Sequence, residues 1–501
     1  MIYTVGTNGD ILRWTGESTQ AAPSEQGRNR TMMNTKKLVL VDPAGITGMG
    51  EGYKSPHEPI GLSIIGGYAL GKNIETTIVC ATENDLFDSV ERILVQEPTH
   101  VGIGAFLYNL PHALRLAGSI KAIDPDVVII LGGNGVTVDA KALSLDPSLD
   151  YVVKGEGVYA VSDLIEDVPP RGRVFSKGHL IADNPVRTDP DDIPLPLRTE
   201  ETTAGRIRTD LSYPSQEDQR YGSVWTTTGC TNRCKYCQTQ EMFPGSVLFR
   251  DPVRVLEEVE YCRERFGINL FFLTDPVAFG GIAGLKTGHG RDCAALLEKT
   301  GAHFHALTRI DMPDAYWDIL AQAGVAKVAV GIESMVMQGV KDGVSAMRLE
   351  KIEEYASKAA ARGILLRALF MTGYEGQSLE QIEQEIETLK KLKGPTDIRI
   401  SWLTPFEKSA RERQHLFETG AIYTADISRW NGHHPIYKIS GLDTISDFQD
   451  LRIRMYQAFY GSGNPDEAAR ECIKIRPGLR ESYQWFNDNV LNKMETWINY
   501  A

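Results

Sequence analysis

The sequence predicts an α/β protein: a doubly wound domain, then a partial barrel of parallel strands, then a mostly helical C-terminal region. Two observations predict this class. Apolar segments of strand length alternate with amphipathic helices, and the alternation occurs twice, separated by a stretch rich in proline and charge. Strands that are apolar throughout and separated by helices form parallel sheets covered on both faces. Because 501 residues exceed the usual size of one hydrophobic core, several domains are expected.

We divide the chain into five parts by composition and periodicity. Residues 1–36 are a polar extension with one possible hairpin around Asn8-Gly9, a dipeptide that favours tight turns. The remaining parts are the doubly wound domain (37–165), a linker (166–218), the barrel (219–409) and the helical C-terminal region (410–501).

The first alternation contains five predicted strands. They cover residues 36–43, 74–82, 100–106, 126–133 and 150–155, and the predicted helices cover 59–73, 85–97 and 111–124. A doubly wound sheet binds its ligand outside the carboxyl ends of its strands, so the loops that follow these strands are candidate binding loops.

The second alternation contains six predicted strand–helix units. Its strands cover residues 223–228, 269–275, 303–309, 327–333, 365–373 and 397–405, and its helices cover 251–267, 290–301, 314–324, 349–363 and 379–393. Such a series predicts a full or partial barrel, whose chemistry lies at the carboxyl ends of the strands.

The overall composition excludes several classes of protein. The hydrophobic content is 42%, no apolar run of about 18 residues occurs, and the N-terminus does not resemble a secretory signal, so we expect a cytoplasmic protein that does not cross a membrane. A net charge of −13 opposes general binding to nucleic acid. A small-molecule substrate, or a protein or peptide without strong negative charge, is therefore expected. The small molecule is favoured because no separate peptide-recognition domain is evident.

Three of the seven cysteines, Cys230, Cys234 and Cys237, lie within the stretch TTTGCTNRCKYCQTQ. This stretch follows the first barrel strand. A structural zinc site needs four ligands, usually as two separate pairs, and no second pair is present. Three thiolates could instead hold three irons of a [4Fe–4S] cluster and leave the fourth iron open. The other four cysteines are read as packing residues: Cys80, Cys262, Cys293 and Cys472.

The spacing Cys-x3-Cys-x2-Cys, with Tyr236 immediately before the last cysteine, resembles the signature of the radical S-adenosylmethionine superfamily. In that family the open iron binds the amino and carboxylate groups of S-adenosylmethionine. Electron transfer then cleaves S-adenosylmethionine to methionine and a 5′-deoxyadenosyl radical. The resemblance thus implies a [4Fe–4S] cluster held by the three cysteines, with S-adenosylmethionine as its partner.

The resemblance also implies cofactor contacts at the ends of later strands. Thr274 and Asp275 stand where the family commonly contacts the methionine moiety, although Pro276 replaces a second acidic residue that relatives often carry. This departure leaves the role of Asp275 open.

Three further positions resemble family contacts to S-adenosylmethionine. Arg309 and Glu333 resemble positions near its carboxylate and ribose, with structural salt bridges as the alternative. Gly373 opens a loop that would pass under the adenine, where glycine allows close approach of the backbone. The segment TPFEKSA lacks a glycine that relatives often have.

The first domain could hold either of two ligands. The glycine-rich GITGMGEG and Glu83 suggest a dinucleotide, but the spacing is not Gly-x-Gly-x-x-Gly and the helix begins too late. The whole pattern, placed before this barrel, instead resembles the cobalamin-binding domain of cobalamin-dependent radical S-adenosylmethionine enzymes. The Asp-x-His-x-x-Gly motif is absent, and His57 lies in a different context, so no protein histidine is expected on cobalt. The implied contacts are Asp42, Pro43, Phe106, Asn109, Gly132, Gly133, Gly155, Glu156 and Gly157.

The resemblance implies a methyltransferase. One S-adenosylmethionine would methylate cobalamin, a second would yield the radical, and the substrate radical would take the methyl group from methylcobalamin onto an unactivated carbon. An external donor of the flavodoxin or ferredoxin type would supply electrons. Rearrangement, cyclisation and transfer of another part of S-adenosylmethionine stay open. A cofactor sensor without turnover is the rival from another class, but no output module is evident.

Overall fold

The computed structural model describes part of the chain, and every structural statement below concerns that part: residues 3–5, 11–13, 36–43, 58–82, 85–203, 206–207, 219–234, 236–338, 346–442, 444–475 and 484. The chain divides into two compact units, Met1–Thr35 and Lys36–Ala501. In the first unit, β1 (Tyr3–Val5) pairs antiparallel with β2 (Ile11–Arg13), as the predicted hairpin requires.

The first sheet of the second unit has the strand order β4-β3-β5-β6-β7-β8-β9, and its first five strands are parallel. The strands and helices are β3 (Lys37–Asp42), α1 (Ile60–Gly71), β4 (Glu75–Cys80), α2 (Leu86–Leu94), β5 (His100–Gly104), α3 (Leu110–Ile123), β6 (Val128–Gly132), α4 (Ala140–Leu143), β7 (Tyr151–Lys154) and α5 (Val158–Ile165). Helices α1 and α5 cover one face of this sheet, and α2 and α3 cover the other. The predicted doubly wound fold is confirmed, and the strand order places its switch point between β3 and β5.

Two strands lie in the stretch that we predicted to be a linker. β8 (Arg173–Ser176) and β9 (His179–Asp183) pair antiparallel and extend the first sheet. Lys177 and Gly178 join them, both with positive φ, which is the geometry of a two-residue hairpin turn. The linker prediction is therefore corrected here: strands of four and five residues are too short to give a clear periodic signal.

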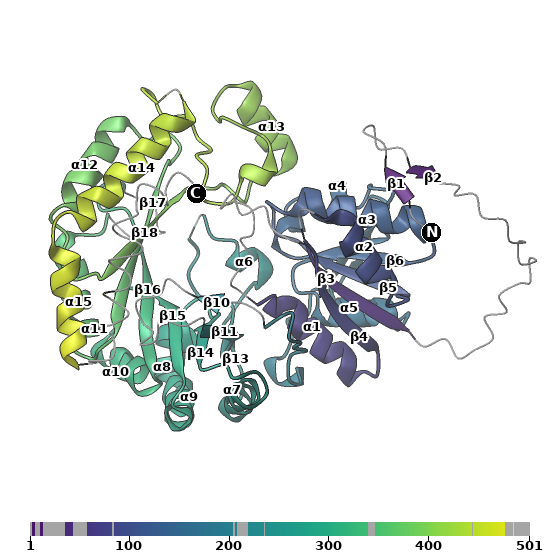
Figure 1. Cartoon of the computed structure of the whole chain (residues 1–501), viewed down its shortest axis with the longest axis horizontal. Coiled ribbons are helices and arrows are strands. Elements are labelled where there is room, and N and C mark those ends of the chain that lie inside the picture. Colours follow the sequence, from purple (N-terminus) through teal and green to yellow (C-terminus); the bar gives the residue numbers. More distant parts are fainter. Residues whose placement is uncertain are drawn as a thin grey trace, which may run out of the picture. The chain divides into compact units, whose positions relative to one another are not determined.

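The second sheet has the order β10-β11-β14-β15-β16-β17-β18. β10 (Arg206–Ile207) is antiparallel to its neighbour, and the six strands that follow are parallel: β11 (Gln219–Val224), β14 (Leu270–Leu273), β15 (His303–Thr308), β16 (Val325–Glu333), β17 (Leu365–Thr372) and β18 (Asp397–Trp402). The intervening helices are α7 (Pro252–Phe266), α8 (Gly281–Thr287), α9 (His289–Leu297), α10 (Asp314–Gln322), α11 (Leu349–Ala360) and α12 (Leu379–Leu389). No pairing joins β10 to β18, so the predicted barrel is a partial one (Figure 1).

The first barrel strand begins earlier than predicted. Its ladder covers Gln219–Val224, whereas the residues that we placed at its end form the separate strand β12 (Thr227–Thr228). β12 pairs with β13 (Leu248–Phe249) and leads directly into the cysteine-rich stretch.

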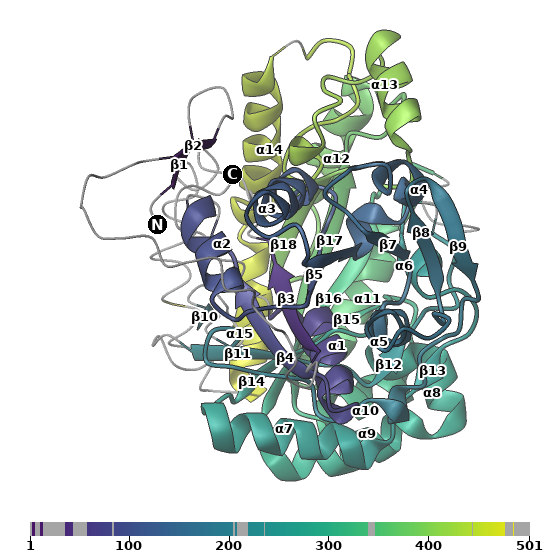
Figure 2. The same ribbon diagram turned by 90° about the vertical axis from the view of Figure 1, so that its right-hand side faces the viewer.

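The C-terminal region packs in two parts. The segment before α14 includes α13 (Ala410–Glu418), and Ile422 and Trp430 of this segment join the core of the first sheet. Helix α14 (Ile445–Tyr460) packs on the barrel core instead, and α15 (Asn464–Ile475) contacts α14 and the barrel helix α11 (Figure 2). The hydroxyl groups of Tyr456 and Tyr460 accept hydrogen bonds from amides of β18, at 3.0 and 3.3 Å, so α14 covers the open edge of the barrel. No described helix has both the length and the apolar composition that a membrane span needs.

A buried ionic network joins the first sheet domain to the barrel. Arg198, from the predicted linker, binds Glu58 before α1 at 2.7 Å and Glu258 on α7 at 2.6 Å, and all three side chains have no exposed surface. Arg250 also pairs with Glu258. Because buried charges are tolerated only when they are paired, these four residues hold the two domains and the linker in one arrangement.

Removal of Glu258 leaves two buried guanidinium groups without their shared carboxylate. We expect Glu258→Ala to lower the free energy of unfolding by about 3–5 kcal/mol. Urea denaturation followed by circular dichroism measures this change. Its neighbour Glu257 is exposed on the same helix, and Glu257→Ala is the matched control. Equal stability of the two variants would contradict the structural role assigned to the network.

Candidate functional site

The three clustered cysteines lie on the loop after β12, at the carboxyl end of the barrel strands. Cys230 and Cys234 are half-buried, Cys237 is exposed, and none of the three forms a disulfide bond. The backbone and side-chain amides of Asn232 donate to the sulfur of Cys230 at 3.4 and 3.3 Å, so this residue orients the side chain of Cys230. No three His, Cys, Asp or Glu side chains of the described residues converge on one point, as a single metal ion would need. In a [4Fe–4S] cluster each thiolate binds a different iron, so this donor set still fits the cluster.

Tyr236 connects the cysteine loop to the end of the fourth parallel strand. Its hydroxyl donates to Glu333 Oε1 at 2.8 Å. Glu333 is buried, has a φ of +68°, and stands at a register shift between β16 and β17. Burial, the Glu333 carboxylate and the Cys234 thiol raise the pKa of Tyr236 above its ordinary value, so the phenol stays a hydrogen-bond donor.

Arg309 lies close to the same loop. Its guanidinium donates to both carboxylate oxygens of Asp311 at 2.9 Å, and its third nitrogen donates to Asn232 Oδ1 at 3.1 Å. The salt bridge that we kept as the alternative for Arg309 is therefore present, with Asp311. Through Asn232, this arginine also positions the loop that carries Cys230.

Asp275 does not face the cysteine loop as a ligand-binding group. Its carboxylate has no exposed surface and accepts hydrogen bonds from the amides of Thr226, Thr227 and Phe279 at 2.7–3.0 Å and from the Thr226 hydroxyl. All its bonding capacity is used inside the protein. This corrects the expected cofactor contact: Asp275 fixes the chain that leads into the loop. The neighbouring Thr274 is half-buried and bonds to the carbonyl of Val224.

Gly373 follows β17 with a φ of +77°, a conformation that favours glycine. A Cβ atom here would lie 2.8 Å from the ring of Trp402. The close approach that requires glycine is thus to a neighbouring tryptophan.

The switch point of the first sheet carries Asn109 and Phe106. The Asn109 amide donates to the carbonyl of Pro43 at 2.9 Å and accepts from the amide of Phe106 at 2.7 Å, so it holds the ends of β3 and β5 together. Phe106 is 50% exposed, and its ring stacks on that of Tyr108 with a centroid separation of 5.6 Å. An exposed flat surface at the switch point suits a large ring system such as a corrin.

The two glycines that end β6 differ in their surroundings. Gly133 has a φ of +97°, and a Cβ atom there would lie 2.6 Å from the carbonyl oxygen of Ala105. Its glycine requirement therefore comes from the protein's own backbone, and the expected cofactor contact at this residue stays a prediction. A Cβ atom on Gly132 would meet nothing closer than 3.8 Å, so this residue leaves room for a ligand.

The loop after β7 is partly occupied by the barrel. Glu156 pairs with Arg187 and accepts from the amide of Thr188 at 3.0 Å, and its side chain is only 9% exposed. These bonds give Glu156 a structural role, and its expected contact with the cofactor stays a prediction. A Cβ atom on Gly155 would lie 3.8 Å from the carbonyl oxygen of Met242, and a Cβ atom on Gly157 would contact the side chain of Ile65.

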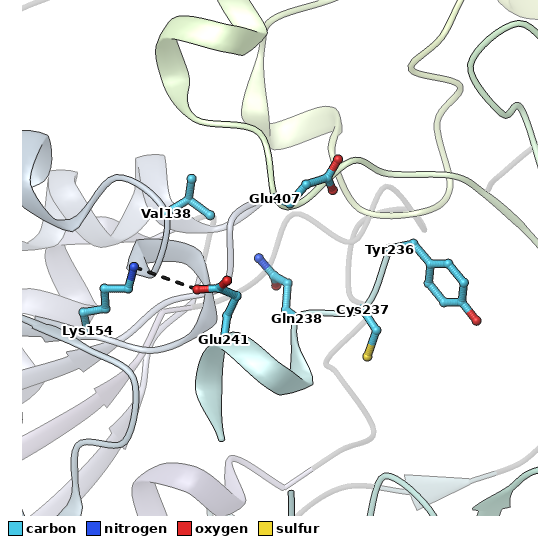
Figure 3. Close-up of a pocket in the computed structure, with 7 residues that line it drawn as sticks. All are labelled: Val138, Lys154, Tyr236, Cys237, Gln238, Glu241 and Glu407. Atoms are coloured by element: carbon cyan, nitrogen blue, oxygen red, sulfur yellow. Dashed lines mark ion pairs between the residues drawn. The ribbon is translucent and has the colours of Figure 1, made fainter. Parts of the chain in front are cut away.

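A pocket of about 150 Å³ lies between the two domains beside this loop. It is lined by Val138, Lys154, Tyr236, Cys237, Gln238, Glu241 and Glu407. Figure 3 shows Lys154 and Glu241 at one end, as an ion pair at 3.9 Å, and Tyr236 at the other end, with Cys237 between them. Sequence reasoning named the two motif residues but missed the other five. Gln238 and Glu241 follow the motif directly, whereas nothing local marks Val138, Lys154 or Glu407.

Two sequence families match this chain. The Radical SAM superfamily matches residues 226–389, and the B12 binding domain matches residues 46–165. Together with the fold and the cysteine loop, these matches define the class: the chain is a cobalamin-dependent radical S-adenosylmethionine enzyme. The predicted cofactors are accordingly confirmed as a [4Fe–4S] cluster, S-adenosylmethionine and cobalamin. His57 and Glu83 lie outside the described residues.

Several characterised proteins are similar to this one at low identity. The anaerobic magnesium-protoporphyrin IX monomethyl ester cyclase of Rubrivivax gelatinosus is 23% identical, over 80% of this chain and 73% of the cyclase. The cytidylyl-2-hydroxyethylphosphonate methyltransferase of Streptomyces wedmorensis is 25% identical, over 57% of this chain and 61% of the methyltransferase. The structure of TsrM, a radical S-adenosylmethionine methyltransferase from Kitasatospora setae, has a TM-score of 0.62 at 16% identity and covers 85% of this chain and 89% of TsrM.

Asp42 ends β3 beside the switch point, and burial raises the pKa of its carboxyl to about 7. The folded chain therefore keeps this proton up to about pH 7, whereas an unfolded aspartate loses it near pH ~4. The contribution of this proton to the free energy of unfolding is fully present below pH ~4 and is lost as the pH rises through 7.

We expect the wild-type chain to lose stability relative to Asp42→Asn between pH 5 and pH 7, with a slope approaching about 1.4 kcal/mol per pH unit. Urea denaturation of the cobalamin-free chains at several pH values measures the difference. Parallel pH profiles for the two proteins would show that Asp42 titrates at an ordinary pKa.

Proposed function

We propose that this enzyme transfers a methyl group from S-adenosylmethionine, by way of cobalamin, to an unactivated carbon of a small molecule. One observation carries the proposal: the shared pocket, which Cys237 and Tyr236 of the cysteine loop line together with Val138 and Lys154 from the carboxyl end of the first sheet. A reaction that uses both cofactors on one substrate needs their two binding regions to open into the same space.

The residues of this chain would hold and orient the reactants. Cys230, Cys234 and Cys237 would bind the cluster, and Tyr236 and Glu333 would position the loop and any group bound beside it. When bound, the cofactors supply a transferable methyl group and a radical able to remove an unactivated hydrogen. Such chemistry needs the exclusion of other hydrogen donors, which a pocket between two domains supports.

A cyclisation is the second candidate reaction. The relative that matches 80% of this chain is a cyclase, whereas the methyltransferase relative matches 57%. The same cofactors, with the same pocket, would serve a radical ring closure if the substrate radical attacked its own carbon framework.

The remaining requirements follow from the proposed chemistry. Each radical cleavage consumes one electron, so we propose an external donor of the flavodoxin or ferredoxin type in the cytoplasm. None of the seven cysteines forms a disulfide bond, which agrees with a reducing compartment.

The product pattern distinguishes the two reactions. We expect the anaerobically reconstituted enzyme, given reductant and S-adenosylmethionine, to form 5′-deoxyadenosine and S-adenosylhomocysteine. Radical cleavage of S-adenosylmethionine yields 5′-deoxyadenosine, and transfer of its methyl group leaves S-adenosylhomocysteine. Mass spectrometry measures both. 5′-Deoxyadenosine without S-adenosylhomocysteine would favour cyclisation, and the absence of both from cluster-loaded enzyme would contradict the proposal.

The three cysteines can be tested separately from cobalamin. We expect Cys230→Ala, Cys234→Ala and Cys237→Ala each to lose the cluster's absorbance and to reduce 5′-deoxyadenosine formation at least ~100-fold, because a cluster needs all three thiolates. Cobalamin binding should persist. Cys80→Ala, on a half-buried strand residue of the first sheet, is the matched control. A variant of the motif that retains the cluster would remove that cysteine from the site.

A further inference from the structure

The last barrel strand, β18, directs alternate side chains to two different sides. Ile398, Ile400 and Trp402 belong to the hydrophobic core under the outer helices. Because successive side chains of a strand point to opposite faces, Asp397, Arg399 and Ser401 face the inside of the partial barrel.

The ionic contacts of Asp397 confirm this orientation and form a floor inside the barrel. Asp397 accepts from Lys327 on β16 at 3.0 Å and from Arg367 on β17 at 2.6 Å. Lys327 and Asp397 have side chains only 3% and 2% exposed. The barrel interior is therefore closed by a paired ionic cluster near the amino ends of these strands.

Arg399 lies one step above this floor, toward the carboxyl ends of the strands. It is exposed, although its strand is covered on the outside, and it makes no side-chain hydrogen bond or ion pair with any described residue. It pairs in register with Leu369 of β17, and Met371 follows on the same inner face. An arginine thus projects into an interior whose neighbouring walls are apolar.

Further cations lie behind Arg399 at the carboxyl end of β18. The carbonyl of Gly432 accepts from the amide of Trp402 at 2.8 Å, which places the loop that carries His433 and His434 beside the strand end. Arg452 of α14 is 4% exposed and donates to the carbonyl of His433 at 3.4 Å.

The hydrogen bonds of His434 show that it is neutral. Arg429 can only donate, so His434 Nε2 accepts from it at 3.1 Å, and Nδ1 must then carry the proton that bonds to Asn431 Oδ1 at 3.0 Å. Burial and the neighbouring arginines lower the pKa of both His433 and His434 to about 4. Among the described residues, the carboxylate of Asp426 opposes this effect and raises the pKa of His434. The positive charge of this region therefore rests on its arginines.

We propose that Arg399 binds an anionic group of the substrate, a carboxylate or a phosphate, inside the barrel. This inference rests on the proposed function, since it takes the barrel interior as the substrate site. A guanidinium group matches either anion with two parallel hydrogen bonds, and such bonds are strong where water is scarce. The arginines behind Arg399 add positive potential, and the ionic floor limits how far the substrate can enter. The carbon to be modified would then point toward the cysteine loop.

Inorganic phosphate is a suitable probe because the substrate is unidentified. The protein is loaded with cluster and cobalamin and saturated with S-adenosylmethionine in the absence of reductant, so that the cofactor sites are filled. Phosphate binding is then followed by 31P NMR titration for the wild type, Arg399→Met, Arg399→Lys and Arg291→Met. Arg291 is an exposed arginine on α9, outside the barrel, and serves as the matched control.

We expect Arg399→Met to weaken phosphate binding at least ~10-fold, Arg399→Lys to weaken it less, and Arg291→Met to leave it unchanged. No measurable binding by the wild type, or equal binding by Arg399→Met, would overturn the proposal. A loss of S-adenosylmethionine affinity in Arg399→Met would also overturn it, because the arginine would then serve the carboxylate of that cofactor. If phosphate binding depends on Arg399 but the wild type forms neither 5′-deoxyadenosine nor S-adenosylhomocysteine, the anion site stands and the proposed reaction fails.

Discussion

The buried carboxylate of Asp275 is the interaction on which the arrangement of the site depends. It binds three backbone amides and one hydroxyl, and it joins the end of β14 to the chain that leaves β11 and to the turn before α8. A buried carboxylate that satisfies four donors fixes those groups because each would otherwise lose a hydrogen bond in a region without water. The cysteine loop starts from this fixed point.

A second set of contacts holds the middle of the cysteine loop, beyond the start that Asp275 fixes. Tyr236 anchors it to Glu333, and Arg309 anchors it through Asn232. The loop itself is irregular, so its shape comes from these side-chain bonds rather than from a regular ladder. Such a loop can present several thiols outward while its backbone stays in place, which is what a cluster ligand set requires.

The two domains are joined by buried ion pairs and by the apolar packing of a C-terminal segment. Arg198 neutralises acids from both domains, and the segment around Trp430 packs on the core of the first sheet. Arg187, from the same predicted linker, bonds to Glu156 of the first domain and to Thr228 beside the cysteine loop. The segment that connects the domains in sequence thus also determines how their carboxyl ends meet around the pocket.

The sequence by itself determined the two α/β domains, the parallel strands and the thiol set, because strand and helix periodicity and the Cys-x3-Cys-x2-Cys spacing are local signals. The tertiary structure alone decided the roles of residues whose partners are distant in the chain. Asp275 and Glu156 stand where ligand contacts were expected, and both carboxylates bond to distant parts of the protein. The conformation of Gly133 is required by the backbone of Ala105. Lys154 joins the pocket, and Arg399 faces the barrel interior, only because strands far apart in sequence lie together. Local patterns specify which residues are available, but burial and long-range pairing decide which of them stay free for a ligand.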